Sequence, residues 1–153
     1  MKRLFIIIFI GFVIALPACF EDDSSGGGFN ASIVINITNS SGKGGTFLAA
    51  VYDFPDIDVT NKDTSQMEGF GYITDITGSD GGTININGIG KETVYLAVIL
   101  DENANNQPDT DEYYYLHDGK TVGSDGDPIT LTDGGTESID ITFPGDALVY
   151  GVD

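Results

Sequence analysis

The sequence is poor in basic residues, has one cysteine and one histidine, and lacks tryptophan. Six lysine and arginine residues stand against 24 aspartate and glutamate residues, so the 153-residue chain carries a formal net charge of −18. Nucleic acids and anionic bilayer surfaces are bound through clustered lysine and arginine that displace counterions. The composition therefore argues against nucleic acid as a partner and favours solubility and the binding of cations.

Side chains for nucleophilic catalysis are scarce as well. His117 is the only histidine, Cys19 is the only cysteine, and the serines near His117 occur in turns, so a paired nucleophile and base are not evident. Carboxylates are abundant, but a sequence does not show whether two of them are held at a set separation in a cleft. We therefore expect a protein that is not an enzyme, with His117 packed on a strand beside Tyr115.

A long apolar run occurs at the N-terminus. Lys2 and Arg3 precede apolar residues 4–14, and residues 16–19 read Leu-Pro-Ala-Cys. A positive start, a short apolar run and small residues before a cleavage point are typical of a secretory signal, and the run is short for a membrane span. Residues 16–19 resemble the lipobox of bacterial lipoproteins, in which a diacylglyceryl group is attached to the cysteine and cleavage makes that cysteine the new N-terminus.

The lipobox resemblance implies a location for the protein in the cell. It implies that fatty chains such as palmitate on Cys19 anchor the mature chain in a membrane of the bacterial cell envelope, and we expect the outer membrane or cell surface rather than the inner membrane. The alternative is a secreted protein in which Cys19 is incidental. An unpaired thiol is a liability in an oxidising compartment, which favours lipidation. The mature chain keeps four basic and 24 acidic residues, a net charge of −20.

Composition divides the chain into three segments. Residues 1–18 form the predicted signal peptide, residues 19–30 form an acidic and then glycine- and serine-rich linker, and residues 31–153 have the length of one domain. The linker composition is typical of a flexible tether that lifts a domain off a membrane. We expect the domain to be monomeric.

The domain has the composition of an all-β fold. Glycine, asparagine, aspartate, serine and threonine are frequent, helix formers are few, and apolar residues alternate with polar ones. Residues 93–100 are apolar on both faces, which predicts a central strand. We expect a two-sheet antiparallel sandwich of about seven to eight strands, which would resemble the immunoglobulin-like or prealbumin-like sandwiches. The predicted strands are residues 33–37, 47–52, 70–73, 83–87, 93–100, 112–116, 129–131 and 138–143.

The triplet Gly-Gly-Thr occurs at residues 44–46, 81–83 and 134–136. Its irregular spacing argues against a structural repeat. We expect each copy to open a strand, with a glycine at positive φ and the threonine beginning the extended segment.

Residues 101–112 carry a recognisable ligand pattern. Counted from Asp101, oxygen-bearing side chains occur at positions 1, 3, 5, 9 and 12, and position 7 offers a backbone carbonyl, which is the EF-hand pattern. Calcium prefers hard oxygen ligands, and a tightly coiled loop supplies several of them from one segment. The candidate ligands are the side chains of Asp101, Asn103 and Asn105, the carbonyl of Gln107, Asp109 directly or through water, and Glu112 with both oxygens.

The loop departs from an EF-hand in two respects. Position 6, usually glycine, is Asn106, which tolerates a left-handed backbone better than most residues. Flanking helices are not evident, so the loop is more similar to the calcium loops that bridge strands in extracellular bacterial β-sandwich modules. With two neutral asparagine ligands, we expect a dissociation constant of about 10⁻⁴–10⁻³ M. The alternative is a merely polar connection rich in turn-forming residues.

The strand rhythm and this loop together resemble the prealbumin-like or carboxypeptidase-regulatory-like group of β-sandwiches, which are often appended to bacterial surface proteins. The resemblance implies a fold and no activity, because sandwich folds host many functions. Two other acidic clusters, residues 53–58 with Asp63 and residues 124–127, lack ligand spacing. We expect solvated loop tips there, and a second metal site is the less favoured alternative.

Three tyrosines follow the loop. Alternation places Tyr113, Tyr115 and His117 on one face of a strand and Tyr114 and Leu116 on the other. If exposed, Tyr113 and Tyr115 would stack on sugars or partner proteins, although packing along the sheet is the more frequent outcome. The sequence thus predicts a lipid-anchored, non-enzymatic module whose calcium loop rigidifies a surface for a protein or glycan partner. The alternative is a carbohydrate-binding or adhesive lipoprotein that uses these two exposed tyrosines.

Overall fold

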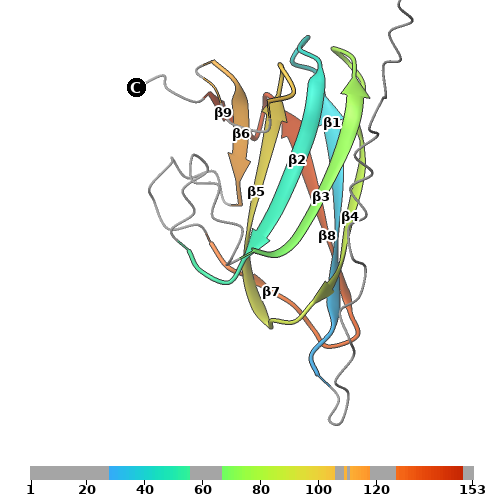
Figure 1. Cartoon of the computed structure of the whole chain (residues 1–153), viewed down its shortest axis with the longest axis vertical. Coiled ribbons are helices and arrows are strands. Elements are labelled where there is room, and N and C mark those ends of the chain that lie inside the picture. Colours follow the sequence, from blue (N-terminus) through green and yellow to red (C-terminus); the bar gives the residue numbers. More distant parts are fainter. Residues whose placement is uncertain (1–27, 56–66, 106–108, 110, 118–126, 150–153) are drawn as a thin grey trace, which may run out of the picture.

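The computed structural model describes residues 28–55, 67–105, 109, 111–117 and 127–149. These residues contain no helix and fold into two β-sheets that pack face to face, which confirms the predicted all-β sandwich (Figure 1). The predicted signal peptide and Cys19 lie in residues 1–27, outside the described residues. No described segment is a helix with the length and hydropathy needed to cross a membrane.

Nine strands run through the described part of the chain, and each predicted segment overlaps one of the first eight. The two-residue strand β9 has no counterpart among the predictions. The strands are β1 (Ala31–Asn39), β2 (Gly45–Tyr52), β3 (Met67–Ile76), β4 (Gly82–Ile89), β5 (Thr93–Asp101), β6 (Tyr113–Leu116), β7 (Ile129–Thr130), β8 (Thr136–Phe143) and β9 (Leu148–Val149).

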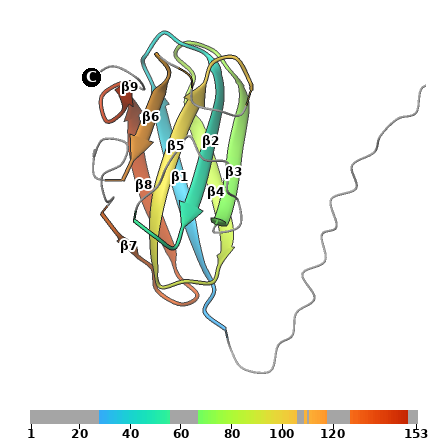
Figure 2. The ribbon, with the colours of Figure 1, turned by 60° about the vertical axis from the view of Figure 1, so that its left-hand side comes forward.

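The larger sheet has β5 at its centre, as its two apolar faces predict. Its strand order is β3-β2-β5-β6-β9, and β7 pairs with the start of β5. The smaller sheet has the order β4-β1-β8. Figure 2 shows the two layers, with β1 and β8 behind β2 and β5.

One strand pair differs from the predicted antiparallel arrangement. β1 and β8 run parallel from Ser32 opposite Thr136 to Asn39 opposite Phe143, whereas β1 and β4 are antiparallel. Alternation of apolar residues specifies which face of a strand is buried and says nothing about strand direction, so the sequence pattern could not reveal this pair. Between β1 and β8 the chain crosses to the larger sheet, where β7 pairs with the start of β5, and such a crossover allows two strands to run parallel.

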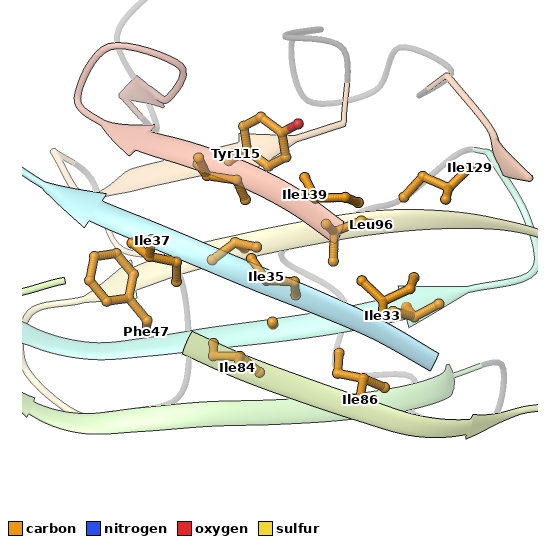
Figure 3. Packing of buried hydrophobic residues seen from close by; sticks show 14 of the residues in the cluster. Ile33, Ile35, Ile37, Phe47, Ile84, Ile86, Leu96, Tyr115, Ile129 and Ile139 are labelled. Carbon is orange, nitrogen blue, oxygen red and sulfur yellow. The ribbon is translucent and has the colours of Figure 1, made fainter. Parts of the chain in front are cut away.

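The core lies between the two sheets and is built from alternate residues of β1, β4 and β8 on one side and of β2 and β5 on the other. Ile33 and Ile35 are completely buried and point between the layers (Figure 3). Phe47 of β2 packs edge-on against Phe143 of β8, with ring centroids 4.9 Å apart. Because each such side chain contributes about 1.5–3 kcal/mol when fully buried, these contacts hold the layers together.

The outer faces of the two sheets differ in polarity. On the smaller sheet, Asn36 Nδ2 donates to Asp140 Oδ1 at 2.9 Å and to Ser138 Oγ at 3.2 Å. The outer face of the larger sheet instead carries a second apolar cluster, which explains why β5 is apolar on both faces. The buried members of this cluster are Tyr52, Ala97, Tyr114 and Leu116.

β3 is an edge strand of the larger sheet, and its two faces carry different residue types. Gly69 and Gly71 face inward, where isoleucine methyl groups of β4 fill the space that a Cβ atom would need. Phe70 and Tyr72 therefore project outward and are 50% and 61% exposed. Their ring centroids lie 6.1 Å apart, so β3 presents a pair of neighbouring aromatic rings to solvent.

Each Gly-Gly-Thr triplet opens a strand, as predicted, at the starts of β2, β4 and β8. Gly45 and Gly134 have φ of 150° and 69°, so the expected positive φ holds for two triplets. Gly81 and Gly82 do not have a positive φ. Gly81 is needed for a different reason, because a Cβ atom there would overlap the carbonyl oxygen of Ile37.

Candidate functional site

The loop between β5 and β6 lies at one end of the sandwich, at the top of Figure 1. β5 and β6 are antiparallel neighbours, and their pairing from Leu100 opposite Tyr113 to Ala97 opposite Leu116 fixes both ends of the loop. Residues 102–105, 109, 111 and 112 are described between the strands. The expected carbonyl ligand Gln107 and the left-handed turn at Asn106 lie outside the described residues.

Both ends of the loop carry buried carboxylates. Asp101 has no exposed surface, and Glu112 is 4% exposed. Glu112 Oε1 accepts a hydrogen bond from the Glu102 amide at 2.9 Å, and its Oε2 accepts one from the Asp109 amide at 2.7 Å. The Glu112 carboxylate therefore joins the start of the loop to its end.

The electrostatic setting of Glu112 opposes its ionised form. Burial is the largest cause that raises the pKa of Glu112 above its usual value, and the charges of Asp101 and Asp109 raise the pKa further. The hydrogen bonds from the amides of Asp109 and Glu102 act in the opposite direction. A cation in this loop would offset the repulsion among the three carboxylates.

Asn103, Asn105 and Asp109 converge inside the loop. Asn103 Nδ2 and Asn105 Nδ2 donate to Asp109 Oδ2 at 2.5 and 2.6 Å. The Asn105 amide donates to Asp101 Oδ1 at 3.2 Å and to Asn103 Oδ1 at 3.0 Å. Hydrogen bonds thus link the first three predicted ligands with Asp109, and the Asp109 amide links them to Glu112.

The donor set fits a hard cation in its chemistry, because all its ligand atoms would be carboxylate or amide oxygens. Within the described ranges, no group of three or more acidic, histidine or cysteine side chains is arranged to hold a metal ion. Ligation by this loop therefore also needs its asparagine oxygens. The amides of Asn103 and Asn105 present nitrogen to Asp109, and a half-turn of each amide group would present oxygen instead.

The backbone of the loop bends at positions that differ from those of an EF-hand. Ala104, at position 4, has a φ of 59°, and Asp111, at position 11, has a φ of 74°. Aspartate occupies the left-handed region more readily than alanine does, because its short polar side chain hydrogen-bonds locally. The described part of the loop therefore stores backbone strain at Ala104.

Lys43, in the turn between β1 and β2, is a part of this region that the sequence did not predict. Its Nζ lies 2.6 Å from Glu102 Oε1 and donates to the Asp111 carbonyl at 2.7 Å. The ammonium also lies 5.0 Å from the centroid of the Tyr113 ring. The hydrogen bond with Glu102 raises the pKa of Lys43 above its usual value. Lys43 is 59 residues from Glu102, and no sequence spacing signals such a contact.

An open pocket of about 210 Å³ lies between Lys43 and the loop. Its volume suits an ion with its water rather than a large organic ligand. The lining residues are Lys43, Glu102, Asn103, Asp109, Asp111 and Glu112.

Comparisons with protein-family models, with curated proteins and with solved structures found no match to this chain.

The tyrosines behind the loop pack along the sheet, which was the more frequent expected outcome. Tyr115 is 8% exposed and belongs to the core between the sheets (Figure 3), and the partly buried Tyr113 packs against that core. Tyr115 is therefore not exposed and Tyr113 is only partly exposed, because their register turns both rings inward while Tyr114 joins the outer cluster. His117 lies beside Tyr115 as predicted, with its Nδ1 3.1 Å from the Tyr115 hydroxyl, but it follows β6 directly in a turn and is not on the strand.

Sequence reasoning also missed the exposed rings of Phe70 and Tyr72. The signal was present in the run Gly-Phe-Gly-Tyr, because glycines on one face of a strand allow close packing there and leave the aromatic residues on the other face.

Of the other acidic clusters, Asp53 is described and lies 3.2 Å from Lys91 Nζ, and Asp127 is exposed. Residues 56–63 and 124–126 lie outside the described residues.

Proposed function

We propose that the protein is a lipid-anchored, non-enzymatic module of the bacterial cell envelope, and that its β5–β6 loop binds calcium. Calcium stabilises the end of a sandwich whose surfaces serve binding or assembly. The fatty chains, including palmitate, are carried by Cys19, and residues 19–30 act as a tether at the outer membrane or cell surface.

The convergence of the loop side chains is the observation that carries the calcium proposal. Asn103 and Asn105 both reach Asp109, and Glu112 is held by backbone amides at both ends of the loop. Asp101 and Glu112 are buried carboxylates whose mutual repulsion a divalent cation would relieve. Asp101, Asn103, Asn105, Asp109 and Glu112 would hold the ion, with the Gln107 carbonyl as a further ligand, and the ion would supply rigidity rather than catalysis.

A thermal melt of the mature protein tests this proposal. We expect about 10 mM calcium to stabilise the fold by about 1.4–2.7 kcal/mol if the dissociation constant is about 10⁻³–10⁻⁴ M. The same magnesium concentration serves as the control, because magnesium demands a stricter octahedral geometry. A melt that calcium leaves unchanged in the wild-type protein would overturn the calcium part of the proposal.

The lipid anchor needs a separate test, because it rests on residues 16–19. Metabolic labelling with a fatty acid should label the full-length protein and should fail with Cys19→Ser, since the thiol carries the diacylglyceryl group. Mass spectrometry of the purified protein should place the modification at Cys19. An unmodified N-terminal residue in natively purified protein would remove the anchor.

Phe70 and Tyr72 favour a second candidate function, the binding of a glycan. Two neighbouring exposed rings on a strand offer flat apolar faces on which sugar rings stack, and a neutral glycan is not repelled by the acidic domain. Binding on a glycan array should be lost in Phe70→Ala and Tyr72→Ala and kept in Asn85→Ala, which changes the polar face of β4. An array without wild-type binding would remove this candidate.

A further inference from the structure

The backbone of Lys43 is fixed by the turn that carries it. Asn39 at the end of β1 is 3% exposed, and its Nδ2 donates to the Lys43 carbonyl at 2.9 Å. The Asn39 Oδ1 accepts hydrogen bonds from the amide and hydroxyl of Ser41, and the Ser41 hydroxyl accepts one from the Lys43 amide at 3.1 Å. Both backbone groups of Lys43 are therefore held, and its side chain leaves the turn in a defined direction.

The Lys43 side chain bridges both ends of the β5–β6 loop. Its ammonium contacts Glu102, at position 2 of the loop, and the carbonyl of Asp111, at position 11. About one-third of the side-chain surface of Lys43 and of Glu102 remains exposed, so the pair is partly shielded from solvent. The ammonium lies over the Tyr113 ring, 5.0 Å from its centroid. The ammonium thus places a positive charge in contact with both ends of the loop.

We infer that Lys43 is a built-in counter-cation of the loop, which stabilises its metal-free form and lowers its affinity for calcium. The inference rests on the proposed calcium binding. Lys43 shares the open pocket with Asn103, Asp109 and Glu112, so its charge lies beside the proposed ligands. Without metal, the ammonium offsets part of the acidic charge of the loop. With calcium bound, the same ammonium repels the ion, because Lys43 and the proposed ligands line one pocket.

Lys43→Met tests this inference, because methionine keeps an unbranched apolar stem over Tyr113 and removes the charge. Lys91→Met is the matched control, since Lys91 also pairs with acidic side chains, at 3.2 Å to Asp53 and 4.0 Å to Glu68. Lys91 precedes β5 and the loop follows it, so about 26 Å of strand separates them, well beyond the screening length. Lys43→Arg restores the charge.

The readouts are calcium titration by calorimetry and melting of the mature protein with and without calcium. We expect Lys43→Met to bind calcium on the order of 3- to 10-fold more tightly than wild type. Its metal-free melting temperature should be lower by about 2–4 °C. Lys91→Met should match wild type in calcium affinity, and Lys43→Arg should return the affinity to within about twofold of the wild-type value.

The outcomes separate this inference from the proposed function. Calcium binding by wild type with unchanged or weaker affinity in Lys43→Met would overturn the counter-cation role and leave the calcium loop intact. Equal tightening in Lys43→Met and Lys91→Met would also overturn it, because net charge alone would then explain the effect. An absence of calcium binding in every variant would remove the proposed function itself, and the inference with it.

Discussion

The two ends of β5 carry similar charges in different structural settings. Before the strand, Lys91 is 48% exposed and lies 3.2 and 4.0 Å from two acidic side chains. At the opposite end, where β5 leads into the loop, Lys43 of the β1–β2 turn lies 2.6 Å from Glu102, and buried Asn39 fixes the backbone of that turn. Exposed pairs of the first kind contribute about 0–1 kcal/mol. The comparison teaches that backbone order and burial, rather than the number of charges, separate a candidate site from a solvated surface.

The largest expected effect comes from placing a methyl group where β2 touches the loop. In Gly45→Ala the new Cβ would lie 2.8 Å from Glu102 Cα and overlap the Asp101 carbonyl oxygen. We expect a loss of about 2–4 kcal/mol in the free energy of unfolding, measured by urea denaturation. At the other end of β5, Gly90→Ala would meet Glu68 Oε2 at 3.8 Å, which is an ordinary contact, and should change stability by less than about 0.5 kcal/mol. Equal losses of unfolding free energy in Gly45→Ala and Gly90→Ala would contradict the difference between the two ends of β5.

The next largest expected effect is the loss of calcium-dependent stabilisation. Asp101→Asn keeps the shape of a buried side chain and the acceptor for the Asn105 amide, but it removes one ligand charge. The calcium-dependent stabilisation of about 1.4–2.7 kcal/mol should therefore disappear from the thermal melt. Asp53→Asn removes the same charge beside Lys91 and should retain the wild-type calcium response. If both variants keep the response, residues 101–112 do not bind the ion.

The sequence predicted the fold well because strand faces are local properties. Alternation located β1 to β8, and the two apolar faces of residues 93–100 placed β5 at the centre of its sheet. The parallel pairing of β1 with β8 was missed, since alternation contains no information on direction. β9 was missed because Leu148 and Val149 do not alternate with polar residues, whereas the equally short β7 lies in the alternating run Ile-Thr-Leu at residues 129–131.

The candidate site was predictable only where its parts are neighbours in sequence. The loop ligands follow a spacing within twelve residues, and the described members do converge. Lys43 comes from another turn, so its contact with Glu102 depends on the pairing of β2 with β5. Alternation puts Tyr113 and Tyr115 on the same face of their strand, but it does not show whether that face points to the core or to solvent. The register of β6 against β5 decides this and turns both rings inward.

A smaller effect should be visible in the pH dependence of the metal-free protein. The pKa of Glu112 is raised chiefly by burial, so the folded state holds this proton more tightly than the unfolded state does. Stability from this group is therefore present at low pH and is lost as pH rises from the usual glutamate value through the raised folded pKa. Urea midpoints between about pH 4 and 7 should show this slope in wild type relative to Glu112→Gln.

Two comparisons sharpen the Glu112 experiment. Glu137→Gln, at an exposed position of β8, removes an acid outside the loop and should retain the wild-type slope. Calcium should reverse the sign for the wild-type protein, because a bound cation favours the ionised carboxylate. Identical slopes in wild type and Glu112→Gln would show that Glu112 does not oppose folding in its ionised form.

The smallest expected effect uses the backbone strain at the loop end of β5. Ala104 has a φ of 59°, a conformation that costs an alanine about 1 kcal/mol and costs a glycine almost nothing. Because glycine also loses more conformational entropy on folding, Ala104→Gly should stabilise the metal-free protein by only about 0.5 kcal/mol, measured by urea denaturation. Glu92→Gly, at the other end of β5, lacks a positive φ to relieve and should destabilise by about 0.5–1 kcal/mol. Opposite signs would show that backbone strain belongs to the loop end of β5, whereas a destabilised Ala104→Gly would mean that this bend is not strained in solution.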